Sequence, residues 1–180
     1  HYLRAKEAGV KFITVDPIYT ASAQMLDAYW IPIRTGTDTA FMLGVASEML
    51  RLDKEEGDVI DWDFLDKYTV GFDADHKPDD LKEDVNFRDY VEGVYDGQPK
   101  TAEWASNICG VPVEQITYFA REIGKTRNVW MLHNFAAARC NGSENVPQLF
   151  MTLGAMGGHF GKPGNCTANN CHANAGNGGP

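Results

Sequence analysis

The sequence lacks the features that mark several classes of protein. It has no apolar run near the roughly 20 residues that cross a bilayer and no charged-then-apolar leader, so we expect no direct membrane insertion. A net charge of −9, with 16 scattered Lys and Arg residues, argues against a nucleic-acid partner. The four cysteines form no CxxC pair, and Cys166-x4-Cys171 has no second pair to complete a tetrahedral site. We therefore assign no metal ligand.

Catalytic motifs are missing as well. There is no GxSxG, no HExxH, no P-loop, and no GxGxxG after the first predicted strand. We assign no catalytic residue and expect a chain that holds a cofactor, whose chemistry would perform the reaction. Because the chain starts at His1 inside a helical pattern and ends in a Gly/Asn-rich stretch, we expect a segment of a longer polypeptide that is inactive by itself.

An ordinary globular composition is present, with 43% apolar and 23% charged residues. Helical and β-branched patterns alternate, which indicates an α/β fold with a mainly parallel, Rossmann-like sheet and helices on both faces, within a larger multidomain subunit. We interpret residues 1–160 as the α/β segment, 57–100 as a surface excursion and 161–180 as a loop or tail. The predicted strands cover 11–16, 30–33 and 128–132, and the predicted helices 2–9, 20–28, 37–50, 61–68, 87–94, 101–108, 113–123 and 143 or 145 to 156.

Each predicted strand runs into a loop with polar residues. The first loop begins at Asp16-Pro17, the second spans Arg34 to Asp38, and the third spans His133 to Arg139. In open α/β sheets ligands bind outside the carboxyl ends of the strands, so these loops are expected to share one site.

The second loop has the chemistry of a guanine pocket. Asp38 offers two acceptor oxygens to the adjacent N1–H and N2–H donors of guanine. Gly36 lets the backbone approach the base, and Arg34 can face a phosphate or the ring. Thr37 is expected to cap the following helix through its hydroxyl. The alternative is that Asp38 only complements the helix dipole.

Three other residues have two interpretations each. Asp16 accepts from ribose hydroxyls or makes a turn with Pro17. Arg139 binds a phosphate or is an exposed charge, and His133 contacts a ligand or is a structural histidine. Thr20 is expected to cap the helix after the first strand.

At these motifs the sequence resembles a known family. Asp16-Pro17-x-x-Thr20, Trp30-Ile-Pro-Ile-Arg34-x-Gly36-Thr37-Asp38 and Arg139-x-Asn-Gly142 resemble the molybdopterin oxidoreductases of the dimethyl sulfoxide reductase family. The stretches at 64–73, 104–106 and 120–124 look most like its anaerobic catalytic subunits. Ile18 and Thr35 stand where the family often has Arg and Pro, so a phosphate contact at position 18 is not expected.

The resemblance implies a cofactor and a set of residues that bind it. The cofactor is molybdenum bis(molybdopterin guanine dinucleotide), with Asp38 facing guanine, Asp16 near the ribose and the third loop near the pyrophosphate or pterin. The implied cofactor-binding residues are Asp16, Pro17, Thr20, Arg34, Gly36, Thr37, Asp38, His133, Asn134, Phe135 and Arg139.

The resemblance also implies a reaction and partners. The whole enzyme would reduce an S-oxide or N-oxide terminal acceptor by oxygen-atom transfer in anaerobic respiration, with an iron–sulfur cluster upstream of this chain. Its partners would be a small oxide substrate, an iron–sulfur electron-transfer subunit and a membrane anchor subunit, and its location periplasmic or membrane-associated through those subunits. The alternative function is a non-catalytic guanine-nucleotide-binding or interaction module.

Overall fold

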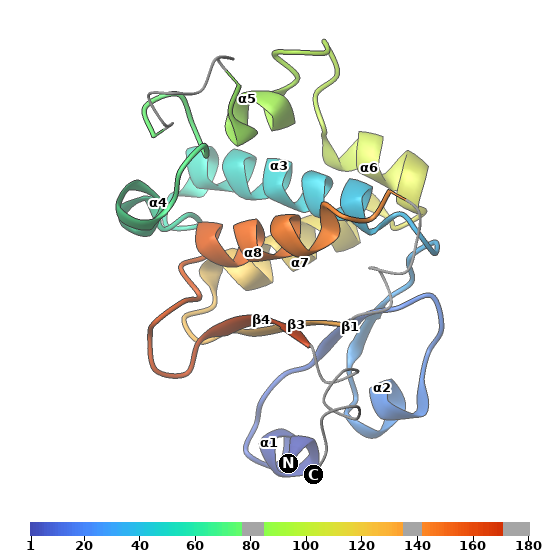
Figure 1. The fold of residues 1–180 in the computed structure, drawn as a ribbon. Coiled ribbons are helices and arrows are strands. Elements are labelled where there is room, and N and C mark those ends of the chain that lie inside the picture. Colours follow the sequence, from blue (N-terminus) through green and yellow to red (C-terminus); the bar gives the residue numbers. More distant parts are fainter. Residues whose placement is uncertain (77–84, 135–141, 171–180) are drawn as a thin grey trace, which may run out of the picture.

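The computed structural model describes residues 1–76, 85–134 and 142–170 (Figure 1). Most of its regular structure is helical, with short strands between the helices. The strands are β1 (Ile13–Val15), β2 (Tyr29–Ile31), β3 (Trp130–Asn134) and β4 (Cys166–Asn170). The helices are α1 (Tyr2–Glu7), α2 (Ala21–Met25), α3 (Asp38–Glu56), α4 (Trp62–Tyr68), α5 (Phe87–Glu92), α6 (Ala102–Cys109), α7 (Val113–Lys125) and α8 (Val146–Met156).

The strands pair in parallel, as the alternation of elements predicted. β1 pairs with β2 in a register that joins Val15 to Ile31, and β3 pairs with β4 in a register that joins His133 to Asn169. Within the described residues these are two separate two-stranded sheets, whereas the sequence predicted one sheet. The structure therefore confirms helices with short parallel strands, and it does not confirm a single Rossmann-like sheet.

Strand β4 lies in the Gly/Asn-rich stretch for which the sequence predicted a loop or tail. Its first residue, Cys166, donates its N–H to the carbonyl of Val129 at 3.0 Å, just before β3 begins. The strand has no alternation of apolar residues that would reveal it. Pairing with β3, rather than its own propensity, makes it a strand.

Helix α3 is the centre of the core. It packs against α5, α6, α7 and α8. Its buried residues surround the helix from Ala40 to Ala46, whereas Arg51, Lys54 and Glu55 near its end are exposed. A Cβ placed on Gly44 would lie 2.4 Å from Cβ of Ala105, so α3 and α6 approach closely at this glycine. The sequence predicted this buried helix, but it continues to Glu56.

The helices cover the strands on both sides. In Figure 1, α3, α6, α7 and α8 lie on one side of the strands, and the short helices α1 and α2 lie on the other. On the side of α1, Tyr2 stacks on Trp130 of β3 with ring centroids 6.0 Å apart. No helix in the described part of the chain is long and apolar enough to cross a membrane.

The sequence interpretation made residues 57–100 a surface excursion. Of its described parts, 57–76 and 85–100, α4 and α5 lie beside α3 in Figure 1, and Leu65, Phe72 and Val91 contribute to the core. Asp53 anchors the start of this segment. Its carboxylate accepts from the N–H groups of Val59 and Ile60, at 2.9 and 3.0 Å. Burial opposes ionisation, but these hydrogen bonds and one from an indole hold the pKa of Asp53 below its usual value.

Candidate functional site

The first two predicted loops lie side by side at the carboxyl ends of β1 and β2. The Asp16 N–H donates to the carbonyl of Ile31 at 3.2 Å, and the indole Nε1 of Trp30 donates to the carbonyl of Asp16 at 2.8 Å. The Asp16 loop and the segment leading to Asp38 therefore start from one edge, as expected for loops that share a site.

The Asp16 side chain makes a turn in this position. Its Oδ1 accepts from the Ile18 N–H at 2.9 Å, and Pro17 between them is exposed. Its other oxygen, Oδ2, has no hydrogen bond within the described residues, so one acceptor is open to a ligand. Thr20 caps α2, with Oγ1 accepting from the Ala23 N–H at 3.1 Å, as predicted.

The predicted capping role of Thr37 is wrong. Its Oγ1 donates to the carbonyl of Arg34 at 2.7 Å and makes no hydrogen bond to the first turn of α3. Gly36 between them has φ +75, a conformation that favours glycine, and the chain turns back on itself there. The start of α3 is therefore left without a side-chain cap. The space beside Gly36 is open, because a Cβ built there would meet no atom within 4 Å.

Arg34 is bound to the end of α6. Its Nη1 donates to the carbonyls of Asn107 and Ile108, each at 3.1 Å, and its backbone N–H donates to the carbonyl of Cys109 at 2.9 Å. Carbonyls in the last turn of a helix lack partners within the helix, so a guanidinium satisfies them well. The side chain predicted to face a phosphate or base thus joins β2 to α6.

His133 lies near the end of β3, the third predicted strand. Burial lowers the pKa of its half-buried imidazole, and the negative charge of Asp38 opposes that shift in part. Its ring lies 5.2 Å from the ring of Phe150 on α8. Asn134 ends β3, while Phe135 and Arg139 fall outside the described residues.

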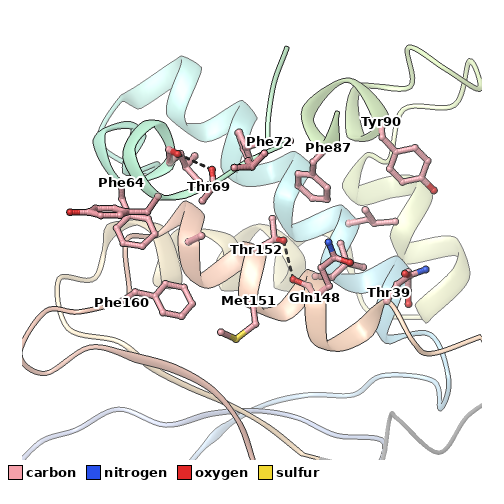
Figure 2. A pocket seen from close by; sticks show the side chains of 18 residues that line it. Thr39, Phe64, Thr69, Phe72, Phe87, Tyr90, Gln148, Met151, Thr152 and Phe160 are labelled. Atoms are coloured by element: carbon pink, nitrogen blue, oxygen red, sulfur yellow. Dashed lines mark hydrogen bonds between the residues drawn. The ribbon is translucent and has the colours of Figure 1, made fainter. Parts of the chain in front are cut away.

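A pocket of about 640 Å³ opens between α3, α4, α5 and α8, and the sequence did not reveal it. One of the residues that line the pocket is Thr39, which directly follows Asp38. Figure 2 shows Thr39 and Gln148 close together at one end, and Phe64 and Phe160 at the other. These residues come from helices far apart in the sequence, so only the packing of α8 on α3 could have identified the pocket.

No group of His, Cys, Asp and Glu residues suited to a metal ion is found in residues 1–76, 85–134 and 142–170. Cys109 is buried, and burial raises the pKa of its thiol. The described residues therefore offer acceptor carboxylates and an uncapped helix start after β1 and β2, and an imidazole near the end of β3.

Comparison with known proteins identifies the family, although no protein-family model matches the chain. Trimethylamine-N-oxide reductase from Haemophilus influenzae is 35% identical over 164 residues, which are 91% of this chain and 18% of that protein. Dimethyl sulfoxide reductase DmsA from Escherichia coli is 34% identical over 157 residues, which are 87% of this chain and 19% of that protein. The chain belongs to the dimethyl sulfoxide reductase family.

This membership confirms the resemblance found at the strand-end motifs, and the family implies a molybdenum–pterin cofactor. The chain spans under a fifth of the length of these family members. Its fold is similar to part of acetylene hydratase from Pelobacter acetylenicus, with a TM-score of 0.69 and 21% identity, over 91% of this chain and 19% of that one.

Proposed function

We propose that this chain is the part of a molybdenum oxidoreductase that holds a guanine nucleotide of molybdenum bis(molybdopterin guanine dinucleotide). The observation that carries the proposal is the shared edge of the first two strand-end loops, where Asp16 lies beside the Trp30 strand. The negative charge of Asp38 also acts on His133, near the end of β3. The whole enzyme would reduce an S-oxide or N-oxide acceptor, since the relatives named above are an N-oxide reductase and a sulfoxide reductase.

The residues present fit a guanine nucleotide. The two oxygens of Asp38 match the two donors on the Watson–Crick edge of guanine. The space in front of Gly36 is open, and the uncapped N–H groups at the start of α3 suit acceptor oxygens of a base or phosphate. The open oxygen of Asp16 can accept from a ribose hydroxyl on the same edge.

Each part of the chain has a holding role in this proposal. Asp38 would accept hydrogen bonds from the base, and Asp16 would accept one from the ribose. The loop from His133 through Arg139 would lie close to the pyrophosphate or pterin. When bound, the molybdenum centre supplies oxygen-atom transfer and accepts two electrons. Arg34 contributes indirectly, because it holds the second loop against α6.

The family background extends the proposal beyond this chain. The two parallel strand pairs, with helices on both sides, would be parts of a Rossmann-like dinucleotide-binding sheet. An iron–sulfur cluster, an iron–sulfur electron-transfer subunit and a membrane anchor subunit would complete the electron path. Such an enzyme would work in the periplasm or at the membrane through those subunits.

The test is the Asp38→Asn variant of the cofactor-loaded protein. The amide places a donor against a guanine donor and loses a charge-assisted bond, on the order of 1.5–3 kcal/mol. Molybdenum and guanine content of the purified variant should both fall. Asp63→Asn, which changes an exposed aspartate in the first turn of α4, is the matched control and should load normally.

Unchanged molybdenum and guanine content in Asp38→Asn would overturn the assignment. Binding of free guanosine monophosphate by the purified chain, with no molybdenum in the protein, would instead support a non-catalytic nucleotide-binding module.

A further inference from the structure

Helix α8 has no charged residue between Val146 and Met156. A helix without a charged face is normally buried on most sides, because little of its surface favours water. In the described residues α8 packs against α3, α4, β3 and β4. Gln148 is nevertheless exposed, and Leu149 and Met151 are only partly buried. The composition of α8 therefore indicates a further neighbour, which the described residues do not include.

The incompletely covered face of α8 forms one wall of the pocket of about 640 Å³, and α3, α4 and α5 contribute the others (Figure 2). Although 23% of the chain is charged, none of the described residues that line the pocket is Asp, Glu, Lys, Arg or His. Charged groups on the neighbouring helices pair elsewhere, as Arg88 does with Glu92. Phosphate groups need cationic or N–H partners, so a dinucleotide does not suit this cavity, whereas an uncharged occupant does.

Large apolar side chains surround the opening of the pocket. Among the residues that line it, Tyr68 is 72% exposed and Val70 is 70% exposed. The ring centroid of Tyr68 lies 5.0 Å from that of Phe64, which stacks on Phe160 with centroids 5.8 Å apart, so the aromatic surface continues from Tyr68 to Phe160. Exposed apolar side chains grouped around a cavity mark a surface that another part of a protein covers.

The relatives of this chain indicate where a covering segment would come from. The matched residues are under a fifth of the length of the two family members named above, so a protein of that length has most of its residues outside this segment. Segments joined in one chain meet at high effective concentration. The Thr39 hydroxyl and the Gln148 amide line the pocket and make no hydrogen bond within the described residues, so both are open to such a segment.

We propose that the pocket and the open face of α8 form an interface inside a longer polypeptide and seat an uncharged, apolar segment of that same polypeptide from outside residues 1–180. Aliphatic or aromatic side chains of the segment fill the space between Phe160 and Gln148, and its backbone N–H and C=O groups meet the Thr39 hydroxyl and the Gln148 amide. Because Thr39 directly follows Asp38, the interface also supports the start of α3. This interface rests on family membership and not on the guanine site, so either assignment can fail alone.

The experiment places the photo-cross-linking residue p-benzoylphenylalanine in the full-length protein in place of Tyr68, whose aromatic ring it retains. Light should join it to a peptide with apolar side chains from outside residues 1–180, which mass spectrometry identifies. A mixture of isotope-labelled and unlabelled protein shows whether the link lies within one copy, as expected. The same residue in place of Asp63, an exposed and charged position of α4, is the matched control and should not give this product.

A pair of substitutions at Thr152 gives a second measurement that does not need the cross-linker. Thr152 lines the pocket and is partly buried. Thr152→Glu would place a charge inside the covered interface, so limited proteolysis of the full-length protein should be at least about tenfold faster, whereas Thr152→Val should change it little. The absence of a link outside residues 1–180, a link to a second copy or to another protein, or equal proteolysis of the two variants would each overturn the proposal.

Discussion

The indole Nε1 of Trp30 donates a 2.8 Å hydrogen bond to the backbone carbonyl of Asp16. This bond joins the Asp16 loop to strand β2, at a separation of 14 residues in the sequence. Tyr19 packs on the same indole, with ring centroids 5.6 Å apart, so the loop after Asp16 is held on the face of Trp30. The position of the Asp16 loop against β2 therefore depends on this indole, together with the Asp16 N–H bond to the Ile31 carbonyl.

Replacing that side chain by Trp30→Phe tests this dependence. Phenylalanine keeps a ring against Tyr19 but leaves the Asp16 carbonyl without its donor, at a cost of about 1–2 kcal/mol. We expect a lower unfolding midpoint and weaker cofactor retention. Trp104→Phe is the control, because the Trp104 indole Nε1 makes no hydrogen bond in the described residues. Equal effects of the two substitutions would show that the bond has no special role.

Arg34→Gln separates a structural role from a phosphate contact. Removing the guanidinium leaves the carbonyls of Asn107 and Ile108 to solvent, and because the site is exposed we expect a loss of only about 1 kcal/mol, seen in thermal unfolding. Arg127→Gln, at an exposed arginine with no ion pair in the described residues, should leave stability unchanged. Cofactor content that falls in Arg34→Gln while the unfolding midpoint stays constant would contradict the structural role.

The Asp53 network predicts a pH dependence of stability. Because the folded pKa of Asp53 is below its unfolded value, its contribution is complete above about pH 4 and is lost as the pH falls through the folded pKa. Asp53→Asn should cost about 2 kcal/mol near neutral pH, since an amide accepts through one oxygen only. The difference from the unaltered protein should shrink in acid unfolding. A difference that is constant with pH would contradict this assignment.

Gly44→Ala tests the close approach of α3 and α6. The added methyl would lie 2.4 Å from Cβ of Ala105, and overpacking of this kind costs about 1–3 kcal/mol. The double variant Gly44→Ala with Ala105→Gly removes the collision and should recover part of the stability in denaturant unfolding. Failure of the second change to recover any stability would show that the helices do not meet at this pair.

The sequence was sufficient where structure follows from local chemistry. The β-branched run before Asp16, the cap at Thr20 and the buried faces of α3 and α7 each depend on residues within a few positions. These signals predicted the first three strands, most helices and the shared edge of the first two loops. The family motifs at Asp16-Pro17 and at Arg34 to Asp38 lie on that edge, and each is a short run of neighbouring residues, so the sequence alone displays them.

The remaining features depend on partners distant in the sequence. Arg34 meets carbonyls 73 and 74 residues away, and no pattern near it indicates that contact. Thr37 has the composition of a cap, but the turn at Gly36 directs its hydroxyl to Arg34 instead. Strand β4 exists through its pairing with β3. The pocket beside Thr39 requires α8 to pack on α3, which periodicity cannot reveal.

The two parallel strand pairs should form at different times as the chain folds. β1 and β2 are separated only by α2, whereas Val129 and its partner Asn165 are 36 residues apart, with α8 between β3 and β4. Closing the longer loop costs more entropy, and β3 can gain its partner only after that loop has closed. During synthesis the edge that carries Asp16 and Asp38 should therefore be built first. The end of β3 at His133 is then among the last parts of the described segment to be completed.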